Sequence, residues 1–161
     1  MAPRILLVNP PIYDFSAYDF WLKPYGLLRV AGMLRNRADL QLFDYLDRFG
    51  NPHSIQGTLR SDRWGTGKFH SRLIPKPLIF DSIPRRYRRY GIPRDYLKGF
   101  LTKQEPFDFA LIQTGMTYWY PGVKEVMEDL RRISPQTKVV LGGVYATLSP
   151  QHAESLGADL V

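Results

Sequence analysis

The fold is decided by the stretch Val139-Val140-Leu141-Gly142-Gly143-Val144-Tyr145-Ala146-Thr147. Its unbroken apolar run predicts a β-strand that is covered on both faces. The double glycine that follows removes Cβ atoms where the strand meets its loop, so the backbone can adopt positive φ and another group can approach it closely. We therefore expect a buried parallel strand with a functional loop at its carboxyl end.

Two other predicted strands end in a similar way. Residues 4–8 are followed by Asn9-Pro10-Pro11, and residues 108–113 are followed by Thr114-Gly115. Carboxyl ends of parallel strands meet at one edge of a sheet, and in open α/β sheets ligands bind there. The candidate crevice is therefore built from four segments: 9–12, Asp44, 114–118 and 142–147.

Strands and helices alternate along most of the chain, which indicates an α/β fold. We predict strands over 4–8, 40–45, 108–113 and 138–141, and a fifth strand that begins at 158. We predict helices that start at Pro24, over 93–103, over 121–133 and at 149–157. Residues 47–104 interrupt this alternation as an insertion of irregular character, with a short helix around 84–90.

Charge is concentrated in the insertion. The net charge of the chain is +7, and residues 48–103 hold 13 of its 22 lysines and arginines with only three acidic residues. Such a block suits an anionic ligand, nucleic acid or an acidic protein surface. The run Arg85-Arg86-Tyr87-Arg88-Arg89-Tyr90 could grip nucleic-acid phosphates. We favour the simpler reading of an exposed basic face or a docking face, and do not expect a nucleic-acid partner.

Several classes of site are excluded or disfavoured. The chain has no cysteine, so it has no disulfide, thiolate nucleophile or cysteine-ligated iron–sulfur cluster. His53, His70 and His152 are scattered and predict no metal site, and no catalytic residue is assigned. The segment Trp64-Gly65-Thr66-Gly67-Lys68 lacks the glycine spacing and the preceding strand of a phosphate-binding loop. With no signal peptide or long apolar run, we expect a cytoplasmic protein without a membrane partner.

A family resemblance rests on four ordered segments. These are Ile5-Leu6-Leu7-Val8-Asn9-Pro10-Pro11, the run from Pro24 to Leu34 that starts Pro24-Tyr25-Gly26-Leu27-Leu28-Arg29, the stretch 139–147, and Gly157-Ala158-Asp159. Together they resemble the N-terminal cobalamin (B12)-binding-type domain of B12-dependent radical S-adenosylmethionine enzymes. The resemblance covers most of residues 1–161 except the insertion 47–104.

The resemblance implies a Rossmann-like, doubly wound parallel sheet of about five strands, with helices on both faces and cobalamin at its carboxyl edge. Asn9, Pro10 and Pro11 would lie below the corrin ring, and Asp44 lies near the same edge. Thr114, Gly115 and Thr117 would line the nucleotide tail, Gly142 and Gly143 would let it pass, and Tyr145 and Thr147 would lie at the rim.

The resemblance also implies partners. A radical S-adenosylmethionine domain with a 4Fe-4S cluster and S-adenosylmethionine would follow downstream, and it is absent from these residues. The chain would then be the module that holds cobalamin for methyl transfer or related radical chemistry on a small-molecule substrate.

Other B12 domains place a cobalt-ligating histidine after the first strand, but here Asn9-Pro10-Pro11-Ile12-Tyr13-Asp14 has none. We therefore expect base-off cobalamin without a histidine ligand. The alternative is a Rossmann-like scaffold that binds no cobalamin, with its basic insertion contacting the catalytic domain or an anionic substrate. A crevice plugged by Tyr13, Tyr118, Trp119 or Tyr145 would favour that alternative.

Overall fold

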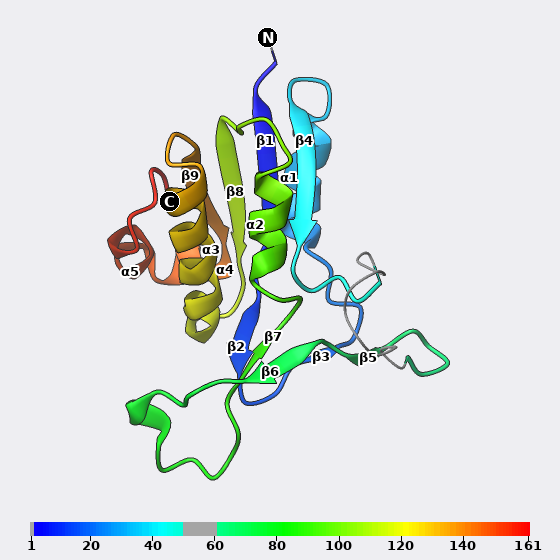
Figure 1. The fold of residues 1–161 in the computed structure, drawn as a ribbon, viewed down its shortest axis with the longest axis vertical. Coiled ribbons are helices and arrows are strands. Elements are labelled where there is room, and N and C mark those ends of the chain that lie inside the picture. The colour runs from blue at the N-terminus through cyan, green and yellow to red at the C-terminus, as the bar shows by residue number, and fades with distance from the viewer. Residues whose placement is uncertain (1, 50–60) are drawn as a thin grey trace.

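A computed structural model describes residues 2–49 and 61–161. Its centre is a parallel four-stranded sheet in the order β4-β1-β8-β9 (Figure 1). The strands are β1 (Arg4–Asn9), β4 (Asp39–Asp44), β8 (Phe109–Thr114) and β9 (Lys138–Gly143). These elements confirm the predicted α/β class and the four complete strands, with boundaries that differ by one or two residues.

Three helices connect the strands of this sheet and cover it. They are α1 (Tyr25–Leu34), α2 (Asp95–Leu101) and α3 (Tyr120–Ile133). From β1 the chain passes through α1 to β4 on one side, then through α2 to β8 on the other side of β1. The direction of strand order therefore reverses between β1 and β8, which is the position where α/β sheets form ligand crevices.

Alternation along the strands divides the core between the two faces of the sheet. Leu6 and Val8 of β1 belong to a large apolar cluster with α2 and α3. Ile5 and Leu7 point to the opposite face, where they pack with Leu27 of α1. The second cluster is the smaller one, because α1 is the single helix that contributes to it within the described residues.

The described part of the insertion contains more regular structure than predicted. It pairs with the segment after β1 in a three-stranded antiparallel sheet, β2-β7-β6, and in a two-stranded one, β3-β5. Their bounds are β2 (Ile12–Asp14), β3 (Tyr18–Asp19), β5 (Gly67–Lys68), β6 (Ser71–Leu73) and β7 (Arg88–Tyr90). A 3-10 turn, η1 (Leu78–Phe80), lies in the loop from β6 to β7.

The short helix predicted around 84–90 is wrong, because Arg88–Tyr90 form strand β7. A helix of this length cannot hold itself together by local hydrogen bonds alone. Here the backbone bonds instead to β2 on one side and β6 on the other, with Tyr13 opposite Arg89.

The C-terminal part contains one helix that was not predicted. After η2 (Thr117–Trp119) and α3, β9 leads directly into α4 (Val144–Leu148), which is followed by the predicted helix, here α5 (Pro150–Ser155). The predicted fifth strand is represented only by an isolated parallel bridge between Val140 and Leu160.

Candidate functional site

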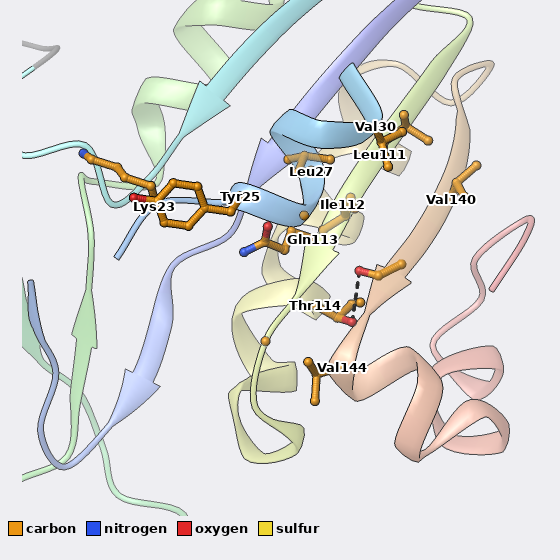
Figure 2. Close-up of a pocket in the computed structure, with 14 residues that line it drawn as sticks. Lys23, Tyr25, Leu27, Val30, Leu111, Ile112, Gln113, Thr114, Val140 and Val144 are labelled. Carbon is orange, nitrogen blue, oxygen red and sulfur yellow. Dashed lines mark hydrogen bonds between the residues drawn. The ribbon is translucent and has the colours of Figure 1, made fainter. Parts of the chain in front are cut away.

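A cavity of about 590 Å³ lies between α1 and the carboxyl ends of β8 and β9 (Figure 2). It exists because α1 packs against β1 and β8 but leaves Leu111 of β8 and Val140 of β9 only half-buried on that face. The remaining lining residues are Lys23, Tyr25, Gly26, Leu27, Val30, Ile112, Gln113, Thr114, Gly115, Gly142, Gly143 and Val144. Most of this surface is apolar, so the cavity suits a ligand with a large apolar or aromatic part.

The two glycines of β9 have different roles. Gly143 has φ of 123°, and a Cβ atom there would collide with the carbonyl oxygen of Thr114. Gly142 has ordinary φ, and a Cβ atom there would meet no atom within 4 Å. Gly143 is therefore required by the turn into α4. Gly142 instead leaves space in the cavity, because it has no side chain.

Polar side chains form a chain across three strand ends. The Nδ2 of Asn9 donates to Oδ1 of Asp44 at 2.7 Å, and the Nε2 of Gln113 donates to Oδ1 of Asn9 at 3.5 Å. The first bond is short, while the second is at the limit of hydrogen-bond length. This chain runs from β4 through β1 to β8 and ends at the cavity, since Gln113 is one of its lining residues (Figure 2).

Asp44 is partly withdrawn from water at the far end of that chain. Burial raises the pKa of its carboxyl group above the ordinary value, although the Leu46 backbone N–H and the Asn9 amide oppose this effect. The Leu46 N–H donates to Oδ1 at 2.8 Å, the same oxygen that accepts from Asn9. Asp44 is therefore a positioned acceptor for Asn9 that lies on β4, two strands away from β8 and the cavity.

Thr114 supports the wall of the cavity through its hydroxyl group. Its Oγ1 donates to the carbonyl oxygen of Gly142 at 3.2 Å and accepts from the backbone N–H of Ala146 at 3.1 Å. The residue is almost fully buried. Its hydroxyl ties β8 to β9 and to the first turn of α4, and both of these bonds are internal to the protein.

The structure brings together some of the predicted site residues. Thr114, Gly115, Gly142 and Gly143 line the large cavity. Asn9, Pro10 and Pro11 line a neighbouring cavity of about 90 Å³, which shares Lys23, Gln113 and Gly115 with the large one.

Four other predicted residues line neither of these two cavities. Asp44 lines a separate cavity of about 530 Å³ between β4 and α2. Thr117 lies in η2, and Thr147 is exposed on α4, where its Oγ1 donates to the carbonyl oxygen of Gly143 at 3.0 Å. Tyr145 is buried in the core, and its hydroxyl lies 2.6 Å from Nδ1 of His152. Helix α4 causes the placements of Tyr145 and Thr147, because it turns side chains inward and outward with helical rather than extended spacing.

Sequence reasoning missed the contribution of α1 to the cavity. Lys23, Tyr25, Gly26 and Val30 all line it. Lys23 ends the predicted loop, whereas Tyr25, Gly26 and Val30 belong to the predicted helix on the sheet. Nothing in their spacing indicates that the helix covers the sheet incompletely. None of the four possible plugs, Tyr13, Tyr118, Trp119 and Tyr145, lines the large cavity, but Trp119 lines the small one beside Asn9, Pro10 and Pro11.

The basic run of the insertion is not a uniform exposed face. Arg89 is 2% exposed and forms a salt bridge with Glu125 of α3, which is 3% exposed. Tyr87 and Tyr90 are buried as well, while Arg85 and Arg86 are exposed. The centre of the run therefore fastens the insertion to α3, and the exposed charge lies before it.

Within the described residues, no group of three His, Cys, Asp or Glu side chains is placed to hold a metal ion. His53 lies outside these residues. Among the helices of the described ranges, none has the length and apolar character needed to cross a lipid bilayer. In comparisons with known proteins, no family model and no curated protein matches the chain.

Proposed function

We propose that this chain is the cobalamin-binding module of a radical S-adenosylmethionine enzyme. The observation that supports it is the open cavity of about 590 Å³ at the carboxyl ends of β8 and β9, beside the reversal of strand order. The sequence resemblance proposes cobalamin at the same edge. In this proposal the sheet is Rossmann-like and doubly wound, and the bridge at Leu160 is the start of its fifth strand.

The residues present fit this group. An apolar slot with a backbone wall at Gly142 suits the flat benzimidazole end of the nucleotide tail, because no side chain blocks the way. Gln113 and Lys23 supply polar atoms at the cavity for the tail's ribose and phosphate, or for amide groups. Asn9, Pro10 and Pro11 would lie below the corrin ring.

The lower side of the cofactor would carry no histidine. Asn9 occupies the strand end and its amide is held by Asp44, so it contributes a fixed amide rather than an imidazole. When bound, cobalamin supplies a cobalt centre suited to methyl transfer or related radical chemistry. The residues of this chain hold and orient the cofactor and exclude water from its tail.

The rest of the chemistry belongs to a partner. Because the chain has no cysteine, a 4Fe-4S cluster with its bound S-adenosylmethionine would have to be carried by another domain, which we propose to be a downstream radical domain of the same protein. That domain would also provide most of the site for the small-molecule substrate.

A visible-absorption titration of the full chain with hydroxocobalamin and with methylcobalamin tests the proposal. We expect saturable binding with a base-off spectrum. Gly142→Val should abolish it, because a Cβ atom at this lining position has free space and the side chain would occupy the cavity. Gly32→Val on α1 is the matched control, since Gly32 also has free space at its Cβ position but does not line the cavity.

The opposite result has a defined meaning. If the folded chain binds neither cobalamin at tens of micromolar, or if Gly142→Val binds as well as the parent chain, the cofactor proposal is wrong. The alternative of a Rossmann-like scaffold that binds no cobalamin, with its basic insertion contacting a catalytic domain or an anionic substrate, then replaces it. One observation favours that alternative: the hydroxyl groups of Thr114 and Tyr145 are already bonded within the protein.

A further inference from the structure

The loop between β6 and β7, residues 74–87, projects from the body of the protein and is named here the finger (Figure 1). At its tip Leu78 is 92% exposed and Ile79 is 83% exposed. Single exposed apolar residues are common on protein surfaces, but two adjacent branched ones at the end of a projection are not explained by the fold.

The finger is built to hold this tip in place. The Nζ of Lys76 donates to the carbonyl oxygens of Asp81 at 3.2 Å and Ile83 at 2.6 Å, which closes the turn from inside. Phe80 points inward, with its ring 5.5 Å from that of Phe15 in an edge-to-face arrangement. Pro77 precedes the turn and fixes its own φ. Leu78 and Ile79 are therefore presented outward by an ordered support.

The finger and its base carry an excess of positive charge. The finger carries Lys76, Arg85 and Arg86 against a single acidic residue, Asp81, and Arg72 and Arg88 lie on the two strands at its base. Arg72, Arg85 and Arg86 are exposed, so their charge is available to an external partner. An exposed apolar tip on a loop that also carries exposed arginines is complementary to an anionic lipid surface, where aliphatic side chains enter the acyl boundary and arginines meet the headgroups.

From this arrangement we propose that the finger binds the surface of anionic membranes, with Leu78 and Ile79 inserted and the exposed arginines of the same loop on lipid phosphates. The shape favours lipid over a protein or nucleic-acid partner. The tip is a projection, which a fluid surface accommodates without a matching pocket, and aliphatic side chains offer no ring for stacking on bases. The absence of a membrane partner was expected from the lack of long apolar runs, which does not bear on a two-residue tip.

Co-sedimentation of the full chain with vesicles tests the proposal. We expect binding to an equimolar mixture of phosphatidylcholine and phosphatidylglycerol, and much weaker binding to phosphatidylcholine alone. Leu78→Ser with Ile79→Ser should weaken binding at least about tenfold, since each methylene group that leaves the lipid costs about fourfold in partitioning. Arg85→Ser with Arg86→Ser should weaken it and reduce its dependence on salt.

Leu148→Ser is the matched control. Leu148 is also an exposed leucine, but it lies on α4 and outside the finger. All these side chains are exposed, so the variants are expected to fold. The proposal is overturned if the chain does not sediment with the anionic vesicles, or if the tip variant binds them as well as the parent chain. Binding to an oligonucleotide but not to vesicles would assign the basic surface to nucleic acid instead. None of these results depends on cobalamin.

Discussion

Replacing Glu125 with alanine should destabilise the protein by about 3 kcal/mol, the lower end of the cost of breaking a buried ion pair. Glu125 accepts from Nε of Arg89 at 2.9 and 3.2 Å, from Nη2 at 2.6 Å, and from the Tyr13 hydroxyl at 2.5 Å. The substitution leaves the Arg89 charge buried and unpaired. The lower end applies because Nη1 keeps its bonds to the carbonyls of Gly91 and Ile92.

Urea unfolding at neutral pH, followed by tryptophan fluorescence, measures this effect. Glu128→Ala is the control on the same helix, where a 52% exposed glutamate pairs with Arg94, and such exposed pairs contribute at most about 1 kcal/mol. If Glu125→Ala costs no more than Glu128→Ala, the reasoning about the buried pair is refuted. Combining Arg89→Met with Glu125→Leu should recover most of the stability, because no unpaired charge then remains.

The same pair predicts a dependence on pH. Burial pushes the pKa of Glu125 up, but the hydrogen bonds and the charge of Arg89 outweigh it, so the folded pKa lies below its ordinary value. A group whose pKa is lower in the folded protein stabilises it above the unfolded pKa, and the contribution is lost as pH falls through the folded pKa. The parent chain should therefore lose stability in acid more steeply than the Arg89→Met, Glu125→Leu variant.

Three further predictions concern the cavity wall and the C-terminal end. Gly143→Ala should cost at least about 1–3 kcal/mol in thermal or urea unfolding, because of its positive φ and the contact with the Thr114 carbonyl; an unchanged midpoint would contradict this. Thr114→Val should cost about 1–3 kcal/mol and loosen α4, since the Ala146 N–H loses its acceptor; hydrogen exchange at that amide would show whether it opens. The Val139 N–H and then Arg131 lower the pKa of Asp159 to about 2, so its contribution is present above the ordinary carboxyl pKa and is lost as pH falls toward 2. Asp159→Asn should remove that part of the acid response, and a parallel pH profile for both proteins would argue against it.

The sequence was sufficient to predict the central sheet because its signals are local. The apolar runs of β1, β8 and β9 and the helical spacing of α3 each indicate one element without reference to the rest of the chain. The strand ends at Asn9, Asp44 and Gly142 then follow from parallel pairing. The positive φ of Gly143 was anticipated as a possibility, and the structure shows the carbonyl that requires it.

What could not be predicted depends on contacts between distant residues. Arg89 looked like part of an exposed basic run, and only Glu125, 36 positions further along, makes it a buried side chain in a strand. Helix α4 begins after a glycine and depends on the Thr114 hydroxyl, which lies 32 positions before Ala146. The cavity itself arises because α1 leaves parts of β8 and β9 uncovered. No local sequence pattern encodes how much of a sheet a helix covers.

The hydrogen bonds that join Asp44, Asn9 and Gln113 have a fixed order of donors and acceptors. An ionised carboxylate can only accept hydrogen bonds, so Asp44 orients the amide of Asn9 with its nitrogen toward Asp44. The amide oxygen of Asn9 then accepts a hydrogen bond from the nitrogen of Gln113. The remaining oxygen of Gln113 is then the atom offered at the cavity, which selects for ligands that carry an N–H or O–H donor there. Protonation of Asp44 would allow the whole sequence of donors and acceptors to reverse, so a carboxyl group two strands away from β8 influences the hydrogen-bonding preference of the pocket.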